Sequence, residues 1–318
     1  MIETLTQSIR PLDPHRVRFQ AMASDCELLF IGVSDLQAKA LAELAELAIT
    51  EVKRIEAKYS RYLPGSELNR INGLAGNDIC IDAETAGLLQ FAADGYRLSG
   101  GLFDITVAPL QRLWGFGLNE KWLPTNADVQ ATLEHIGFER LRFYKDKGSW
   151  RLFLPAGMSL DFGGIAKEYA ADRALLLMER HAKSLGFDVA VLVNLGGDIA
   201  ASRYPWQIGV EGINPVNKAL ERRENAAGLI GFPGGGLATS GDIKRFLLVD
   251  GKRIGHILSP QTGYPVPTAP RSVTVLAPSA SAAGMLSTLA MLKGEGAEAF
   301  LDAEGLVFMV QRGEAVSN

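Results

Sequence analysis

The sequence has few of the residues that cross-link small proteins or bind nucleic acid. It contains two cysteines, Cys26 and Cys80, among 318 residues, and no paired Cys-x-x-Cys or Cys/His spacing. These numbers exclude a disulfide framework and a structural zinc site. A basic excess is also missing, because 32 Lys and Arg face 36 Asp and Glu, for a net charge of −4. A nucleic-acid binder would carry a basic stripe, so we expect no nucleic acid as a partner.

Long apolar runs are missing as well. No stretch reaches about 18 uninterrupted apolar residues, so we expect no membrane span. The first 16 residues carry charged side chains and two prolines, Pro11 and Pro14, which is unlike the apolar core of a signal peptide. We therefore expect a cytoplasmic protein in which residues 1–16 form an irregular N-terminal extension.

The remaining chain has the composition of a globular protein, with 47% apolar and 21% charged residues. Amphipathic periodicity predicts helices over residues 36–59, 84–98, 165–185 and 281–292. Short apolar or alternating runs predict strands over residues 26–32, 189–193, 206–210, 245–249, 254–258, 272–276 and 307–310, with an Asp-Gly turn at 250–251 forming a hairpin. Since helices and strands do not alternate regularly, an α+β fold with mixed or antiparallel sheets is favoured, as a single domain over residues 1–318.

Many of the 34 glycines lie in short clusters that are candidate binding turns. In one cluster, a strand is expected to end at Leu160, Gly163-Gly164 follow, and a helix with Lys167 in its first turn begins. Glycines let backbone amides approach a phosphate, and the helix dipole and a lysine would add to its binding. The alternative is a tight turn with Lys167 in solvent. The other clusters are 99–104, 194–198 and 233–242; the 161–167 segment matches neither the P-loop nor the dinucleotide-binding pattern.

Two further polar positions are candidates. His256 is expected on a strand flanked by apolar residues, just before the turn Thr262–Pro265, which would place it at a rim rather than in the core. A structural histidine is the alternative. Ser287 and Thr288 follow Gly284 by three and four residues, so the three share one helix face. A buried threonine usually bonds its own preceding carbonyl, and we expect this of Thr288.

In this order, these segments resemble the ApbE-type flavin transferases, which attach FMN from FAD to a protein threonine or serine. The resemblance covers about residues 19–310 and is carried by eight segments: 19–28, 59–72, 101–117, 159–174, 192–200, 237–246, 256–266 and 281–294. It implies an ApbE-like α+β domain, FAD as substrate, Mg²⁺ as metal, and an acceptor flavoprotein as partner.

The resemblance also implies roles for individual residues. Those expected to contact FAD are Met22, Tyr62, Leu102, Phe103, Asp104, Asp161, Lys167 and Ile257. Mg²⁺ would be held by the main-chain carbonyl of Gly164 and by the side chain of Thr288. His256 and Lys167 are the expected catalytic residues. The family's acceptor motif is not found in this chain, so the resemblance predicts an acceptor on another protein.

Three positions depart from the family pattern. Gly284 stands where an aspartate is usual, four residues before Thr288; Ser259 replaces the acid of His-x-x-Asp-Pro; and Met22-Ala23-Ser24 replaces Met-Gly-Thr. Mg²⁺ prefers anionic oxygen ligands, so Gly284 predicts weaker metal binding and raises the question of turnover. Two alternatives follow: a flavin-binding protein without the chemistry, and a hydrolase that splits FAD into FMN and AMP.

Overall fold

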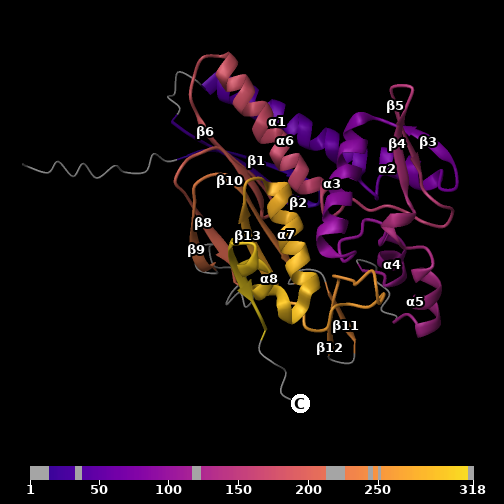
Figure 1. Ribbon diagram of the computed structural model, residues 1–318. Helices are drawn as coiled ribbons and strands as arrows, with labels where there is room; N and C mark the ends of the chain where they lie inside the picture. The colour runs from indigo at the N-terminus through magenta and orange to yellow at the C-terminus, as the bar shows by residue number, and fades with distance from the viewer. Residues whose placement is uncertain are drawn as a thin grey trace, which may run out of the picture.

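The computed structural model describes residues 14–32, 38–116, 123–212, 226–242, 246–249 and 252–313 (Figure 1). Its helices are α1 (Ala38–Tyr59), α2 (Glu67–Gly73), α3 (Ala83–Ser99), α4 (Ala108–Leu113), α5 (Asn126–Leu133), α6 (Ala166–Ser184), α7 (Ala280–Lys293) and α8 (Ala297–Ala303). Its strands are β1 (His15–Ala21), β2 (Ser24–Ile31), β3 (Asp78–Ile81), β4 (Arg142–Asp146), β5 (Ser149–Phe153), β6 (Ala190–Leu195), β7 (Asp198–Ala201), β8 (Trp206–Glu211), β9 (Ala226–Phe232), β10 (Gly235–Gly241), β11 (Phe246–Val249), β12 (Lys252–Gly255), β13 (Ser272–Ala277) and β14 (Val307–Gln311).

A seven-stranded sheet organises the fold, in the order β1-β2-β6-β7-β10-β13-β14. The described strand pairs of this sheet all run antiparallel. Smaller antiparallel units are the sheet β3-β5-β4 and the pairs β8-β9 and β11-β12. The α+β class with antiparallel sheets, expected from the sequence, is therefore confirmed.

Both faces of the central strands are buried, which explains their continuous apolar sequence. In β6, Val191 and Val193 pack into the main core with residues of α1 and α6, whereas Leu192 packs into a second core with Trp206 and Phe232 from β8 and β9. Alternate side chains of a strand point to opposite faces, so one apolar run feeds two cores. Figure 1 shows α1, α6 and α7 lying across the sheet.

Helices α6 and α7 run past each other in a fixed register. Asp172 of α6 accepts hydrogen bonds from the backbone N–H groups of Ala280 (2.8 Å) and Ser281 (2.9 Å), at the first turn of α7. One turn away along each helix, Glu168 contacts Gly284: a Cβ built on Gly284 would lie 2.6 Å from Glu168 Oε1. A shift of four residues is about one helical turn, or about 6 Å. The register is therefore antiparallel.

The four helices expected from periodicity are confirmed within two residues at each end. The hairpin around the Asp-Gly turn is confirmed as the β11-β12 pair, although residues 250–251 themselves lie outside the described residues. An irregular N-terminal extension was expected over residues 1–16. Residues 1–13 lie outside the described residues, and His15 and Arg16 belong to β1. The expected strand ending at Leu160 is wrong, because β5 ends at Phe153 and an irregular segment leads to α6.

The described ranges hold no helix with the length and apolarity that crossing a membrane requires. The cytoplasmic location expected from the sequence stays a prediction.

Candidate nucleotide and metal site

The Glu168 side chain is buried in the interface between α6 and α7. The residue is 7% exposed, and within the described part of the chain its Oε2 atom has no hydrogen-bond partner. Burial, and then the nearby charge of Asp198, raise the pKa of the Glu168 carboxyl. Gly284 leaves the space that this carboxyl group fills. The sequence alone predicts that Gly284 weakens metal binding, but in the structure a carboxylate from another helix lies beside it.

Asp198 brings a second buried carboxylate to the start of α6. Its Oδ2 lies 3.5 Å from Lys167 Nζ, and it accepts a hydrogen bond from the backbone N–H of Thr239. Burial raises the pKa of Asp198, and the charge of Lys167 opposes this. Lys167 is therefore not in free solvent, as one alternative from the sequence held, but pairs with Asp198, the first residue of β7.

The turn between β1 and β2 reaches the same place. Met22 and Ala23 have positive φ angles of 51° and 54°, and the Met22 N–H donates a 2.6 Å hydrogen bond to Glu56 Oε1 on α1. Ser24 lies against Gly196, where a Cβ would be 2.7 Å from Ser24 Oγ and 3.9 Å from Lys167 Nζ. Gly196 also has a φ of 70°. Both this left-handed backbone conformation and the close approach of Ser24 favour glycine at this position.

The hydroxyl groups of α7 bond to β10. Ser240 Oγ lies 3.0 Å from Thr288 Oγ1 and 2.8 Å from Ser287 Oγ. The carbonyl bond that we expected of Thr288 is made instead by Ser287, whose hydroxyl donates to the Gly284 carbonyl at 3.0 Å. The bond from Ser240 keeps the Thr288 oxygen on the side of α7 that faces β10.

The segment 101–104 packs between the two helices. A Cβ on Gly164 would lie 3.9 Å from Phe103 Cε2, and a Cβ on Gly95 of α3 would lie 2.9 Å from Phe103 Cδ1 and 2.7 Å from Met285 Cε of α7. Leu102 beside it is partly exposed. The Phe103 ring thus connects α3, the residue before α6, and α7.

The carboxylate of Asp104 is already used within its own loop. It accepts hydrogen bonds from the N–H (2.7 Å) and hydroxyl (2.7 Å) of Thr106 and from the N–H of Phe138 (3.0 Å). Burial raises its pKa. These bonds are those of a residue that shapes the loop, and a direct contact with FAD stays a prediction.

Asp161 and Tyr62 are joined by Arg61. Arg61 Nη1 lies 2.8 Å from Asp161 Oδ2, and Arg61 Nη2 donates a 2.7 Å hydrogen bond to the Tyr62 hydroxyl. The Arg61 guanidinium also lies over the Tyr62 ring, 4.9 Å from its centroid. Tyr62 is 72% exposed and presents its ring to solvent.

His256 lies in a bend just after β12, not on the strand where it was expected. Its ring contacts Phe116 edge to face, with centroids 6.3 Å apart. Ile257 packs against the core around Val273 and Met291. Ser259, which replaces the family's acid, organises the following turn: its N–H donates to the Tyr264 carbonyl (2.9 Å) and its hydroxyl accepts from the Thr262 N–H (3.3 Å).

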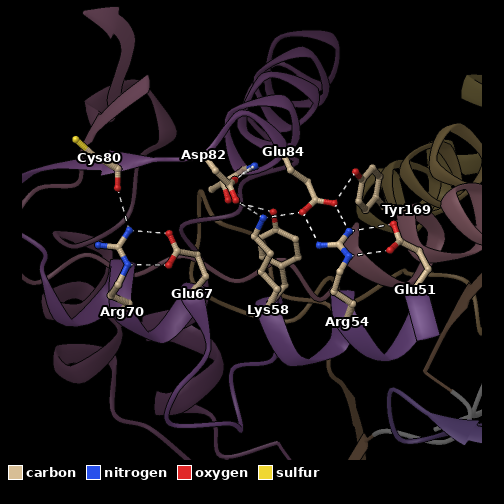
Figure 2. Close-up of polar contacts among 11 residues, drawn as sticks. Glu51, Arg54, Lys58, Glu67, Arg70, Cys80, Asp82, Glu84 and Tyr169 are labelled. Atoms are coloured by element: carbon tan, nitrogen blue, oxygen red, sulfur yellow. Dashed lines mark hydrogen bonds and ion pairs between the residues drawn. The ribbon is translucent and has the colours of Figure 1, made fainter. Parts of the chain in front are cut away.

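A charged network fixes the first turns of α6 and α3 (Figure 2). Glu84 accepts hydrogen bonds from Arg54 (2.6 Å), Lys58 (2.6 Å) and the hydroxyl of Tyr169 (3.0 Å), and Arg54 also bonds Glu51 (2.7 Å). Hydrogen bonds from Arg54 are the largest cause that lowers the pKa of Glu84, to about 2. Tyr169 follows Glu168 directly, so the network holds the backbone that carries the buried acid.

Comparison with known proteins places the chain in a family. The ApbE family model matches residues 22–309. This chain belongs to the ApbE family. It is 32% identical over 256 residues to the FAD:protein FMN transferase of Haemophilus influenzae, covering 77% of this chain and 70% of that protein. It is 29% identical over 296 residues to the enzyme of the same name from Salmonella typhimurium, covering 89% and 81%.

Solved structures agree with this membership. The ApbE protein of Thermotoga maritima superposes with a TM-score of 0.80 at 30% identity, covering 95% of this chain and 97% of that one. The flavinyl transferase ApbE of Pseudomonas stutzeri, in its apo form, has a TM-score of 0.79 at 28% identity, covering 95% and 92%. The resemblance to the family and the ApbE-like fold, both expected from the sequence, are confirmed.

Three residues of the site were missed from the sequence. Glu168 had a signal, since an acid directly after Lys167 falls on the buried side of the predicted helix. Asp198 was part of a glycine cluster, and Arg61 part of a family segment, but neither had been given a role. Glu168 is recognised by its burial, and Asp198 and Arg61 by their ion pairs, which a single sequence does not display.

The oxygen donors at the α6–α7 contact suit a hard cation. The Glu168 carboxyl lies against Gly284, and the Thr288 hydroxyl is one turn further along α7. The Gly164 carbonyl lies in the turn two residues before α6. Within the described residues, no group of three or more His, Cys, Asp or Glu forms a complete metal site. Mg²⁺ needs no such cage, because it keeps waters and takes oxygens from substrate phosphates.

Proposed function

We propose that this protein transfers FMN from FAD to a threonine or serine hydroxyl of an acceptor protein and releases AMP, with Mg²⁺ at the α6–α7 contact. The observation that supports the proposal is the antiparallel register of α6 and α7, which sets Asp172 against Ala280 and the Glu168 carboxyl against Gly284. Membership of the ApbE family supports the reaction class, since its relatives are FAD:protein FMN transferases.

The binding roles follow from where each side chain lies. The Tyr62 ring, exposed and held by Arg61, would stack on a flavin or adenine ring, and Met22 would pack beside it. Leu102, Phe103 and Ile257 would add apolar contacts, and Asp104 would shape the loop that carries Phe103. Asp161 would accept hydrogen bonds from the ribityl or ribose hydroxyls.

Transfer of the FMN group depends on positioning of the two reactants and on neutralisation of the phosphate charges. The acceptor hydroxyl oxygen attacks the FMN-side phosphorus of FAD, a new P–O bond forms, and the P–O bond to AMP breaks. Lys167, next to Asp198, would place a positive charge beside the phosphates. His256 would accept the proton of the attacking hydroxyl, since an imidazole titrates near neutral pH. Mg²⁺ bound at Gly164 and Thr288 would neutralise pyrophosphate oxygens.

The experiment is incubation of the protein with FAD, Mg²⁺ and a peptide that carries the family's acceptor motif. Mass spectrometry would detect one FMN added to the peptide and an equal amount of AMP released. AMP without labelled peptide would instead indicate the hydrolase, and intact, tightly bound FAD would indicate the flavin-binding protein. Either result would contradict the transferase proposal.

A further inference from the structure

We propose that Glu168 supplies the anionic metal ligand that the family pattern places at position 284. This inference rests on the proposed function, because it concerns the same Mg²⁺ site. It assigns to a carboxylate from α6 the role that the family pattern gives to a residue of α7. The departure at Gly284 is then a relocation of the ligand rather than a loss.

The first support is the shape of the contact. A Cβ at position 284 would lie 2.6 Å from both Cγ and Oε1 of Glu168, and 2.8 Å from its Cδ. No side chain other than hydrogen fits there while Glu168 keeps its position. The Glu168 carboxylate therefore occupies the volume in which an aspartate side chain on α7 would begin.

The second support is that one oxygen of this buried carboxylate lacks a hydrogen-bond partner within the described part of the chain. Glu168 is 7% exposed, yet its Oε2 has no hydrogen-bond partner among the described residues. Leaving a buried polar atom without a partner costs about 1–3 kcal/mol, more when the group is charged. A bound cation at this oxygen would remove that cost. Buried polar side chains without partners are rare in folded proteins, and a binding role explains this one.

The third support is the neighbourhood. Asp198 Oδ2 lies 3.5 Å from the Nζ atom of Lys167, the residue before Glu168, so two buried carboxylates lie at the start of α6 with this lysine. Lys167 can neutralise one of the two carboxylates, and a divalent cation would neutralise the other. Thr288 is one turn beyond Gly284 on α7, and Gly164 lies in the turn just before α6; both offer neutral oxygens.

The competing explanation is that Glu168 is a neutral, protonated filler of the space beside Gly284. Binding of Mn²⁺ distinguishes the two. The protein is titrated with Mn²⁺ by calorimetry and by electron paramagnetic resonance, with FAD present and absent. The variants are Glu168→Gln, which keeps the shape and removes the charge; the exchange variant Glu168→Gly with Gly284→Asp; and the control Glu179→Gln, an exposed position on the same helix.

We expect Glu168→Gln to weaken Mn²⁺ binding by at least about tenfold, and the exchange variant to recover most of that loss. Glu179→Gln should bind as the wild type does. Equal binding by wild type and Glu168→Gln would overturn the inference, as would a wild type that binds no Mn²⁺ in either condition. If Glu168→Gln fails to fold, anomalous scattering from Mn²⁺ in wild-type crystals decides: a peak at the Glu168 carboxylate supports the inference, and a peak elsewhere overturns it.

Failure of the proposed function has a different signature. If Mn²⁺ binding depends on Glu168 but no acceptor peptide gains FMN, the metal ligand stands and the transferase proposal falls. If the peptide is labelled while Glu168→Gln binds Mn²⁺ normally, the transferase proposal stands and the metal-ligand inference falls.

Discussion

Arg61 and Asp161, one hundred positions apart in the sequence, form an ion pair with Nη1 2.8 Å from Oδ2. Asp161 also accepts a 2.9 Å hydrogen bond from the Gly163 N–H and donates its own N–H to the Ile105 carbonyl at 2.8 Å. One carboxylate thus fixes the turn before α6, and its arginine partner positions the exposed Tyr62. The pair joins two parts of the candidate nucleotide site.

Removal of Arg61 should therefore weaken FAD binding without removing the fold. Arg61→Ala leaves Asp161 without its cation and Tyr62 without its support, so we expect about tenfold or greater loss of FAD affinity, measured by calorimetry. Arg61→Lys keeps the charge but not the planar guanidinium that bonds both partners. Its FAD affinity should lie between those of the wild type and Arg61→Ala. FAD affinity equal to wild type in Arg61→Ala would show that the pair is structural only.

Gly284→Ala tests the space beside Glu168. The added Cβ would be 2.6 Å from the carboxylate, which must move within a buried interface. We expect a loss of about 1–2 kcal/mol in the free energy of unfolding, measured by denaturant titration, because overpacking exceeds the gain in helix propensity. The matched control is Gly87→Ala in α3, where a Cβ meets nothing within 4 Å. It should be neutral or stabilise by up to about 1 kcal/mol; equal effects of the two variants would contradict the crowding.

Glu84 should make stability depend on pH at the acidic end. Its pKa in the folded protein is about 2, below the ordinary value of 4.5, so its contribution is complete above about pH 4.5 and is lost as pH falls toward 2. Its side chain is 18% exposed, and partial screening reduces the contribution to about 2 kcal/mol. Glu84→Gln should thus be less stable than wild type by about this amount at pH 7, with the difference shrinking below pH 4.5. A difference that does not change with pH would contradict the ion-pair explanation.

His256→Ala should separate binding from chemistry. The ring lies against Phe116, after β12, and we expect its removal to leave FAD affinity within about threefold while slowing peptide labelling by about 100-fold or more. The two readouts are calorimetry with FAD and the rate of FMN transfer by mass spectrometry. An unchanged transfer rate would exclude His256 as the base.

The helices could be predicted because each carries its own periodic pattern. Leu44, Ala48, Val52 and Ile55 of α1 are all fully buried, as their spacing predicts. Strand β10 was missed because its sequence, Gly235–Gly241, has few apolar residues; its pairing with β7 and β13 places it in the sheet. The sequence of a strand does not by itself indicate which other strands it pairs with.

Candidate site residues could be named where glycine turns and polar residues form recognisable segments, as at Gly164, Lys167 and Thr288, and their roles stay predictions. It was missed where the function of a residue depends on a distant one. Nothing near Glu168 in the sequence indicates Gly284, and nothing near Arg61 indicates Asp161, because both contacts span about a hundred residues or more of chain. The position of His256 was also missed, because the strand expected over residues 254–258 ends at Gly255, three residues early.

A crystal structure of this protein with FAD and Mn²⁺, with data collected at the manganese edge, would test the metal and nucleotide site most directly. We expect one anomalous peak between the Glu168 carboxylate, Thr288 and the FAD pyrophosphate, with the flavin or adenine ring against Tyr62. A manganese peak away from the α6–α7 contact, or FAD bound to another face of the protein, would contradict it.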